Sequence, residues 1–232
     1  MSIRNFTLSR YLVGGLSIAL LTAALAGGAS HSKVPEPATD IPTSMAKGKQ
    51  TAVLAGGCFW GVEAVFEHLK GVSSVVSGYS GGNEATANYE VVSSGQTEHA
   101  EAVEITYDPA QISYGQLLKI YFAIAHDPTE LNRQGPDEGP QYRSAIFFTN
   151  DEQKRVAAAY IEQLNKAQTF NKPIVTQLVP LNSFYAAEEY HQDFIARNPN
   201  YPYVVAHDLP KLSQLREQFP DLYKEIAIIN QL

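Results

Sequence analysis

Apolar residues through most of the chain switch repeatedly between the spacing of a strand and that of a helix. Residues 51–55 are a short, continuously apolar run typical of a buried strand, and apolar residues then recur at helical spacing over 62–69. Gly71 stands where such a helix would end. The sequence therefore predicts that the Gly-Gly pair at 56–57 forms a tight turn between strand and helix, with Cys58 at the helix start.

The same pattern predicts the other elements of a single domain over 50–232. Strands are expected at 72–76, 100–107, 144–149 and 174–181, and helices at 113–124, 150–164, 186–196 and 212–219. A glycine-rich loop is expected at 78–82, and a long loop rich in Pro, Gly, Asp and Asn at 127–141. Because strands and helices alternate with one candidate hairpin region among them, we predict an α+β chain folded as a two-layer α/β sandwich.

The first 49 residues carry a different pattern. A positive start precedes residues 11–26, which are almost wholly apolar or small, and a small-x-small triplet at 24–26 fits a cleavage site. This run is shorter than the roughly 20 residues that span a bilayer. We therefore expect a signal peptide at 1–29, with an N-terminal anchor as the alternative, and export to a bacterial periplasm. Residues 30–49 lack hydrophobic periodicity, which predicts a flexible linker.

The composition is that of a globular chain, with 44% hydrophobic and 18% charged residues. The formal net charge is −7, and lysines and arginines are scattered, which argues against nucleic acid as a partner. A single cysteine excludes an internal disulfide and a cysteine-based zinc cluster. The histidines show no His-Glu-x-x-His or related metal spacing, so we expect no bound metal.

Cys58 is the strongest candidate for chemistry, because it stands at the predicted start of a helix. Unpaired N–H groups and the positive end of the helix dipole would favour the thiolate, which is the nucleophilic form. The alternative is a small buried core residue, the usual position of a lone free cysteine. The neighbouring Phe59 and Trp60 are either core residues or exposed aromatics that would hold an apolar methyl group.

The stretch around Cys58 resembles a known family. Residues 56–63, Gly-Gly-Cys-Phe-Trp-Gly-Val-Glu, are similar to the active-site signature of the A-type peptide methionine sulfoxide reductases. Further blocks follow in the family's order, namely Gly78-Tyr-Ser-Gly-Gly82, Thr97-Glu-His-Ala-Glu-Ala-Val103, Tyr107-Asp-Pro109, His126-Asp-Pro-Thr129, Gln141-Tyr-Arg-Ser144 and Ala187-Glu-Glu-Tyr-His-Gln192. The resemblance covers roughly residues 50–205 and implies a ferredoxin-like mixed sheet with flanking helices. It also implies reduction of methionine S-sulfoxide, free and in proteins, to methionine.

Glu101 falls on the family's acid. It shares a strand face with Val103 and Ile105, and burial there would raise its pKa and keep it protonated near neutrality. The residue pattern alone favours a different interpretation, an edge-strand carboxylate paired with a surface lysine. The resemblance reverses that preference and implies that Glu101 donates a proton to the departing oxygen.

The resemblance assigns five more side chains to the site. Tyr89 and Tyr142 would donate hydrogen bonds to the sulfoxide oxygen, although the residues alone favour half-buried packing rings. Asp137 would bind the substrate backbone through water, where the alternative is an ordinary turn residue. Phe59 and Trp60 would form the pocket for the ε-methyl group of the oxidised methionine.

The chain departs from many family members in having no second cysteine near its C-terminus. It resembles the single-cysteine branch, in which Cys58 would become a sulfenic acid and would be reduced by an outside thiol. We expect no organic cofactor and a reductant such as thioredoxin, glutaredoxin with glutathione, or DTT. The expected partners are oxidised proteins, methionine sulfoxide and a thioredoxin-like reductant, and we expect the chain to be a monomer.

Two functions of other classes stay open on the residues alone. A thiol hydrolase would pair Cys58 with a histidine, although no papain-type or caspase-type signature surrounds this cysteine. The candidate histidines are His68, His99, His126 and His191. A non-catalytic exported module would instead bind peptides through the aromatic turn.

Overall fold

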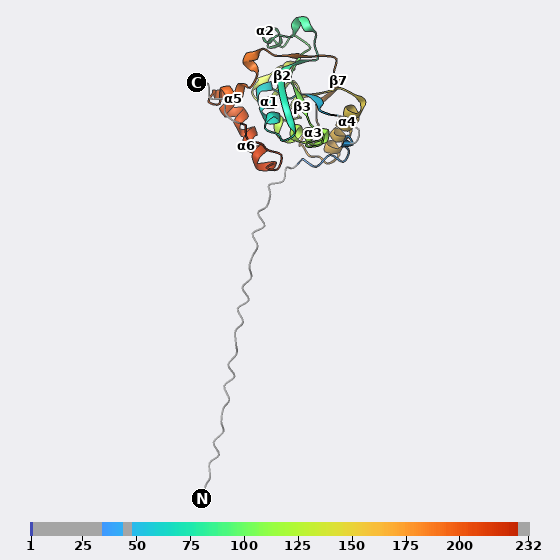
Figure 1. The fold of residues 1–232 in the computed structure, drawn as a ribbon, viewed down its shortest axis with the longest axis vertical. Coiled ribbons are helices and arrows are strands. Elements are labelled where there is room, and N and C mark those ends of the chain that lie inside the picture. Colours follow the sequence, from blue (N-terminus) through green and yellow to red (C-terminus); the bar gives the residue numbers. More distant parts are fainter. Residues whose placement is uncertain (2–33, 44–47, 227–232) are drawn as a thin grey trace.

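The computed structural model of the 232-residue chain describes Met1, residues 34–43 and residues 48–226 (Figure 1). The predicted signal peptide or anchor lies outside these ranges, except for Met1, and so do parts of the predicted linker. Among the described residues, no helix is long and apolar enough to cross a membrane.

Six strands form a mixed sheet in the order β7-β6-β1-β3-β2-β8. Their bounds are β1 (Gln50–Ala55), β2 (Val72–Ser80), β3 (Ala100–Tyr107), β6 (Ala145–Phe148), β7 (Gln177–Pro180) and β8 (Phe184–Ala186). Strands β6 and β7 pair in parallel, and the other neighbours in this sheet are antiparallel. The four central strands, with one helix after β1 and another after β3, follow the order of ferredoxin-like folds, which confirms the predicted α+β class.

The longer helices cover one face of the sheet. The helices are α1 (Phe59–Glu67), α2 (Tyr89–Val92), α3 (Tyr114–Ile120), α4 (Asp151–Lys166), α5 (Phe194–Arg197) and α6 (Leu209–Gln218), with π-helical turns at Tyr121–Ala125 and Val204–Asp208 and 3-10 turns at Glu84–Thr86, Pro140–Tyr142 and Glu189–His191. Apolar side chains of α1, α3 and α4 join inward-facing residues of β1, β3 and β6 in one core cluster. Figure 1 shows α4 at one side of the molecule and α5 and α6 at the other.

Strand β3 has the alternation that the sequence predicts. Val103 and Ile105 belong to the helix-covered core, whereas Ala100 and Ala102 join a second cluster on the opposite face. Glu101 shares the face of Val103, so a carboxyl group lies on the side of the sheet that the helices cover.

Two predicted boundaries are wrong. Strand β2 continues through Ser80, where the sequence predicts a loop from residue 78, because Gly78 pairs with both neighbouring strands and a Cβ there would lie 2.4 Å from the Tyr185 carbonyl oxygen. The helix predicted at 186–196 is instead the end of β8 followed by two short helical turns. Asp193 has a φ of +51° between those turns, which a continuous helix does not allow.

Residues 34–43, which we call the N-terminal strap, are packed against α3 and α4 and are not the flexible linker predicted for 30–49. The first residue of the strap is buried in the main core. Tyr160 of α4 donates a hydrogen bond to the Pro35 carbonyl at 2.6 Å. Asp40 accepts hydrogen bonds from the first turn of α3 and from the residue that caps it. Backbone carbonyls and the carboxylates of Glu36 and Asp40 therefore hold the strap, together with the apolar contact of its first residue.

Candidate active site

The turn between β1 and α1 makes Cys58 the cap residue of the helix, as the sequence predicts. Gly57 has a φ of +92°, and a Cβ there would lie 2.6 Å from the side chain of Gln134. A Cβ on Gly56 would lie 2.9 Å from the ring of His126. Position 57 therefore needs both a left-handed backbone and empty space, which a glycine alone supplies.

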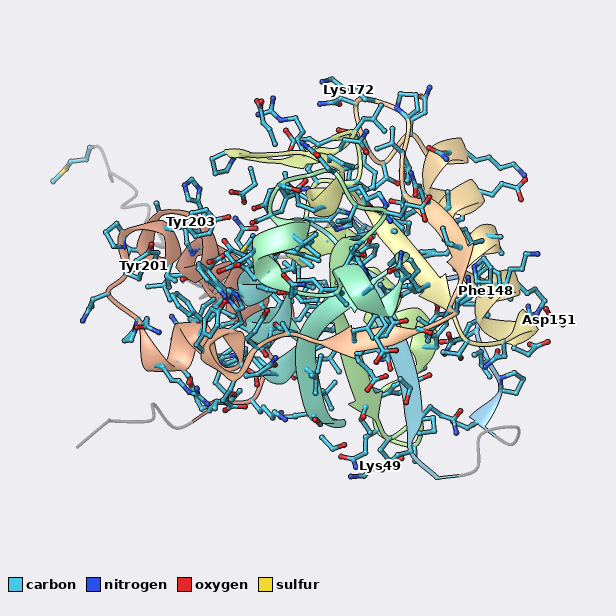
Figure 2. The ribbon with its side chains drawn as sticks, turned by 90° about the horizontal axis from the view of Figure 1, so that it is seen from above. Lys49, Phe148, Asp151, Lys172, Tyr201 and Tyr203 are labelled. Atoms are coloured by element: carbon cyan, nitrogen blue, oxygen red, sulfur yellow. The ribbon has the colours of Figure 1, made fainter. Side chains whose placement is uncertain are left out.

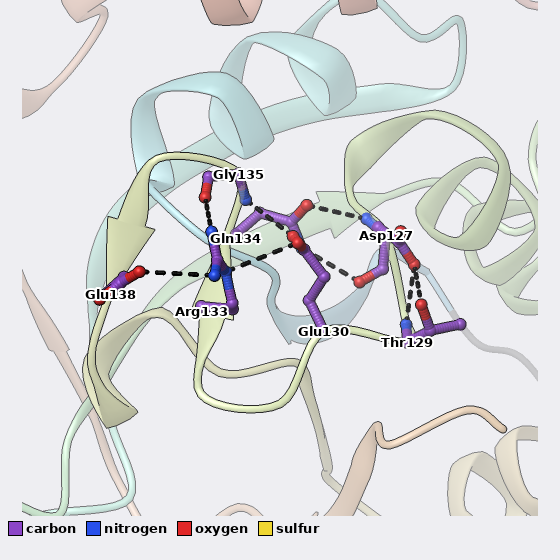
Figure 3. Close-up of polar contacts among 7 residues, drawn as sticks. All are labelled: Asp127, Thr129, Glu130, Arg133, Gln134, Gly135 and Glu138. Carbon is purple, nitrogen blue, oxygen red and sulfur yellow. Dashed lines mark hydrogen bonds and ion pairs between the residues drawn. The ribbon is translucent and has the colours of Figure 1, made fainter. Parts of the chain in front are cut away.

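The long loop that the sequence predicts at 127–141 borders this turn and contains a short hairpin (Figure 3). Strand β4 (Arg133–Gln134) pairs with β5 (Asp137–Glu138). The side chain of Gln134 bonds to both the N–H and the carbonyl of Asp127, at 3.0 and 3.1 Å. Ion pairs of 3.6 and 3.4 Å join Arg133 to Glu130 and to Glu138. These contacts hold β5, and with it Asp137, in place.

Glu101 is buried beside the start of α1. It is 2% exposed, and its Oε2 accepts a hydrogen bond from the Phe59 N–H at 3.0 Å. Burial raises the pKa of Glu101 to about 8; the Phe59 N–H opposes this shift and the charge of Asp137 adds to it. Glu101 is thus buried, as its predicted role requires, and the alternative of an exposed edge carboxylate is wrong.

Cys58 does not have the lowered pKa that its position at a helix start predicts. Burial raises its pKa well above the ordinary value, and the charges of Glu101, Asp208 and Asp137 raise it further. The Trp60 N–H lowers the pKa, as expected of a helix terminus, but the other effects outweigh it. Burial and these charges therefore favour the thiol over the thiolate.

Cys58 lies in a pocket of about 160 Å³. All seven side chains that the sequence analysis selects line this pocket, namely Cys58, Phe59, Trp60, Tyr89, Glu101, Asp137 and Tyr142. Two more lining residues, Tyr201 and Tyr203, come from the segment between α5 and α6 and lie together at one end of the molecule in Figure 2. Segments far apart in the sequence thus meet at one thiol.

Two tyrosine hydroxyls in the pocket keep their protons. Burial raises the pKa of Tyr89 and of Tyr142, and the charge of Glu101 adds to both shifts. Tyr89 stands at the start of α2, where its N–H donates to Glu188 Oε1 at 2.9 Å. Tyr142 ends a 3-10 turn directly after the β4–β5 hairpin. Both hydroxyls can donate hydrogen bonds over the whole neutral range.

Tyr203 is a site residue that the sequence analysis misses. Its hydroxyl donates a hydrogen bond to Asp137 Oδ2. Burial raises its pKa, with further contributions from Cys58 and Asp137. The chain holds 13 tyrosines, and nothing in the proline-rich tail distinguishes this one, so no local signal could have found it.

Phe59 and Trp60 form an apolar wall of the pocket in different ways. Phe59 is 1% exposed and packs against Tyr79 in the main core, so the prediction of an exposed ring is wrong at this position, although the residue lines the pocket. Trp60 is half-buried and stacks on Phe194 with ring centroids 3.7 Å apart. Its Nε1 donates to His191 Nδ1 at 3.1 Å. An apolar group entering the pocket would meet both rings.

Among the described residues no histidine lines the pocket, which removes the basis for a Cys–His pair. The candidate histidines bond elsewhere: His68 to the Ala64 carbonyl, His99 to the Asn83 carbonyl, His126 to the Tyr121 carbonyl and Ser144 Oγ, and His191 to Trp60. Within residues 34–43 and 48–226, no group of three or more His, Cys, Asp or Glu side chains could hold a metal ion.

A half-buried thiol, a buried carboxyl and two hydroxyl donors around one small pocket define a thiol-dependent enzyme of α+β fold. Comparison with known proteins identifies the family within this class. The family model described as "Peptide methionine sulfoxide reductase" matches residues 50–223. The peptide methionine sulfoxide reductase MsrA 2 of Synechocystis sp. is 59% identical, over 82% of this chain and 90% of its own length. The MsrA of Deinococcus radiodurans is 47% identical, over 84% and 94%.

Solved structures agree with these relatives. Methionine sulfoxide reductase A of Corynebacterium diphtheriae superposes with a TM-score of 0.58 at 32% identity, covering 81% of this chain and 95% of that chain. Mxr1 from Saccharomyces cerevisiae in its reduced form gives 0.61 at 34% identity, covering 66% and 88%. The chain therefore belongs to the peptide methionine sulfoxide reductase family, and it reduces methionine sulfoxide by thiol-dependent chemistry.

Proposed function

We propose that this pocket reduces methionine S-sulfoxide, free or within proteins, by direct attack of the Cys58 sulfur on the sulfoxide sulfur. The oxygen moves to Cys58, which becomes a sulfenic acid, and methionine leaves. The substrate sulfur gains the two electrons that the cysteine sulfur loses. The proton on the sulfenic oxygen comes from Glu101, and the proton that Cys58 releases restores the Glu101 carboxyl. The observation that carries this proposal is the buried carboxyl of Glu101, whose pKa burial raises to about 8, in the same small pocket as the thiol.

Glu101 is the proposed proton donor to the sulfoxide oxygen. The sulfur–oxygen bond weakens as Cys58 attacks, and a proton on the oxygen stabilises the charge that develops there. With a pKa of about 8, Glu101 carries that proton at neutral pH. Tyr89 and Tyr142 donate hydrogen bonds to the same oxygen in this mechanism, because their hydroxyls line the pocket and stay protonated.

The other side chains of the pocket are proposed to hold the substrate. The substrate methyl group packs on Phe59 and Trp60, where sulfur–aromatic contact is favourable. Asp137 binds the substrate backbone through a water molecule, and the Tyr203 hydroxyl holds the Asp137 carboxylate in place. A pocket of about 160 Å³ has room for a side chain and not for folded structure, so the methionine sulfoxide must be exposed on its protein.

Regeneration of Cys58 is proposed to need an outside thiol, because the chain has no second cysteine. One thiol displaces water from the sulfenic acid to form a mixed disulfide, and a second thiol releases Cys58 as that disulfide is exchanged. Thioredoxin, glutaredoxin with glutathione, and DTT all supply such thiols.

We also propose that the protein is exported to a periplasm. The support is the positive start, the uncharged apolar run and the small-x-small triplet within residues 1–29. The test is to express the full chain with a C-terminal tag in a Gram-negative host and to measure its mass in the periplasmic fraction. A mature chain that begins within about five residues of position 27 is expected. The uncut mass in the membrane fraction would instead establish an anchor.

A single-turnover assay tests the chemistry. The reduced protein, without added reductant, is mixed with one epimer at a time of a methionine sulfoxide peptide, and Cys58→Ser serves as the control. We expect about one methionine per enzyme from the S epimer only, and one sulfenic acid trapped by a dimedone-type probe. Absence of methionine from both epimers, with Cys58 still a thiol, would overturn the proposal.

A further inference from the structure

Asp208 is a buried carboxylate that the proposed reaction does not use. Its side chain has no exposed surface, and its Oδ2 has no hydrogen-bond partner among the described residues. It occupies the cap position of α6 but makes no side-chain capping bond. Because an unsatisfied buried acceptor costs stability, the position of Asp208 needs another explanation.

The carboxylate lies against the first turn of α1. A Cβ on Gly61 would be 2.2 Å from Asp208 Oδ1 and 2.8 Å from Lys211 Nζ. Lys211 Nζ is 3.4 Å from Asp208 Oδ1. The lysine side chain is 21% exposed and lines an open groove on the surface. The lysine reaches water while its partner does not. Any residue larger than glycine at position 61 would displace the ion pair.

This ion pair connects the two segments that build the pocket. Gly61 follows Cys58 by three residues, within the first turn of α1. Asp208 ends the π-helical turn Val204–Asp208, which begins directly after Tyr203 and packs against α1. The position of Tyr203 relative to the thiol therefore depends on how this turn lies on α1.

The charge of Asp208 also acts on the Cys58 thiol. Burial is the main cause that raises the pKa of the thiol, and the charges of Glu101, Asp208 and Asp137 raise it further. The N–H of Trp60 lowers it. The hydroxyls of Tyr89, Tyr142 and Tyr203 in the same pocket are uncharged at neutral pH, because burial raises the pKa of each. Lys211 is the cation paired with Asp208.

We propose that Asp208, anchored by Lys211, is a positioning residue of the active site: it clamps the Tyr203 segment onto the first turn of α1 and places a negative charge behind Cys58. Asp208 does not line the pocket, so it acts through those two residues. This inference rests on the proposed function, in which Cys58 is the nucleophile.

The first test compares Asp208→Asn, which keeps the size and removes the charge, with Glu217→Gln, an exposed acid on the same helix. The rate of Cys58 alkylation by iodoacetamide is followed from about pH 6 to 10 in the full, reduced chain. In Asp208→Asn the profile is expected to move to lower pH, with alkylation at pH 8 at least about threefold faster than in the wild type. Glu217→Gln should follow the wild type. An unchanged profile in folded Asp208→Asn overturns the proposal.

The second test uses the contact at Gly61. Gly61→Ala alone is expected to slow single-turnover methionine formation at least about tenfold, because the new methyl group displaces the carboxylate. In Gly61→Ala/Asp208→Ala the methyl group occupies the space that the carboxylate leaves, so the rate should equal that of Asp208→Ala alone. Losses that multiply would show that Asp208 does not act at Gly61. The two hypotheses can be told apart, because alkylation of Cys58 needs no sulfoxide. If Cys58 of the wild type is alkylated as expected but no methionine forms, the proposed function is wrong and the role of Asp208 is not contradicted.

Discussion

Cys58 and Glu101 both hold their protons at neutral pH, and burial is the main cause for each. The proposed reaction needs the cysteine as thiolate and the glutamate as acid. The thiol has the higher pKa of the two, so this reactive combination is a minor fraction of the enzyme. Its amount grows with pH while Glu101 stays protonated, and becomes constant once Glu101 begins to lose its proton.

We therefore predict that kcat/KM for a methionine S-sulfoxide peptide rises with pH up to about 8 and then levels off. Below about pH 8, each increase in pH raises the thiolate fraction of Cys58 while Glu101 stays protonated. Above about pH 8, the gain in thiolate is offset by the loss of protonated Glu101. In Glu101→Gln the side chain cannot titrate, so the rate should fall by about 10²–10⁴-fold and should continue to rise beyond pH 8. Steady-state kinetics between about pH 6 and 10 measure both curves.

Glu98→Gln is the matched control, because Glu98 is an exposed acid three residues before Glu101. Its profile should coincide with that of the wild type. A wild-type rate that keeps climbing well beyond pH 8, or a Glu101→Gln profile that levels off in the same way, would show that another group supplies the proton.

The sequence predicts those site residues that stand in short motifs. Cys58, Glu101 and Tyr142 stand in blocks that carry the family resemblance, and they line one pocket in the structure. The raised pKa of the thiol could not be predicted, because burial causes most of it and Asp208 approaches from the distant tail. Tyr203 escapes prediction for the same reason: its bond to Asp137 joins two segments that no local pattern connects.

Elements with a hydrophobic period are predicted well, and elements held by polar contacts are not. Helix α3 begins where the sequence predicts, and Ser113 and Gln116 form its capping box. The N-terminal strap has no such period. Its anchors are the Pro35 carbonyl and the Asp40 carboxylate, whose partners lie on helices far along the chain, so the sequence alone suggests a linker.

Loss of the strap's main anchor should cost stability without affecting chemistry. We predict that Asp40→Ala lowers the free energy of unfolding by about 1–2 kcal/mol, because the first turn of α3 loses the acceptor for the Gly115 N–H and Ser113 loses its carboxylate partner. Urea unfolding followed by tryptophan fluorescence measures the change. Single-turnover rates should stay at the wild-type value, since the strap does not line the pocket.

Glu84→Ala, which removes an exposed acid from a 3-10 turn, is the control for Asp40→Ala and should leave the unfolding midpoint within error. A chain that starts at residue 50, the boundary that the sequence predicts, should be less stable than Asp40→Ala, because it also loses the bond from Tyr160. A second truncated chain, which starts at residue 34 and keeps the strap, is the reference. If it has the same free energy of unfolding as the chain that starts at residue 50, the strap contributes nothing to stability.

The whole molecule combines a predictable centre with edges that depend on tertiary contacts. The central order β6-β1-β3-β2 follows from the family resemblance, and alternation along β3 fixes its two faces. The edge strand β8 is three residues long and pairs with β2 across Gly78, a contact that no periodicity in residues 184–186 reveals. Prediction therefore fails where an element is too short to show a period.

Buried protons are a second property of the whole fold. Glu63 on α1 is 2% exposed, and burial raises its pKa to about 9, with further contributions from the charges of Glu67 and Asp193. Glu67, one turn later and half-buried, has its pKa raised to about 8, again mainly by burial. With Glu101, the folded chain keeps protons on three carboxyls that the unfolded chain releases near pH 4.3.

Stability should therefore fall as pH rises from about 6.5 to 8. Below this window the opposite effect of His68, His126 and His191, whose pKa values burial lowers, offsets that of the carboxyls. In this window the folded state binds more protons than the unfolded state, so the free energy of unfolding decreases with pH, by up to about 1.4 kcal/mol per unit for each buried carboxyl and by less for the partly exposed Glu67. Urea unfolding at half-unit steps gives the slope. Glu63→Gln should make the slope shallower, whereas the exposed Glu217→Gln should not change it. A free energy of unfolding that stays constant or increases across this range would mean that the three carboxyls are ionised in the folded chain, and Glu101 would then lack the proton that the proposed reaction requires.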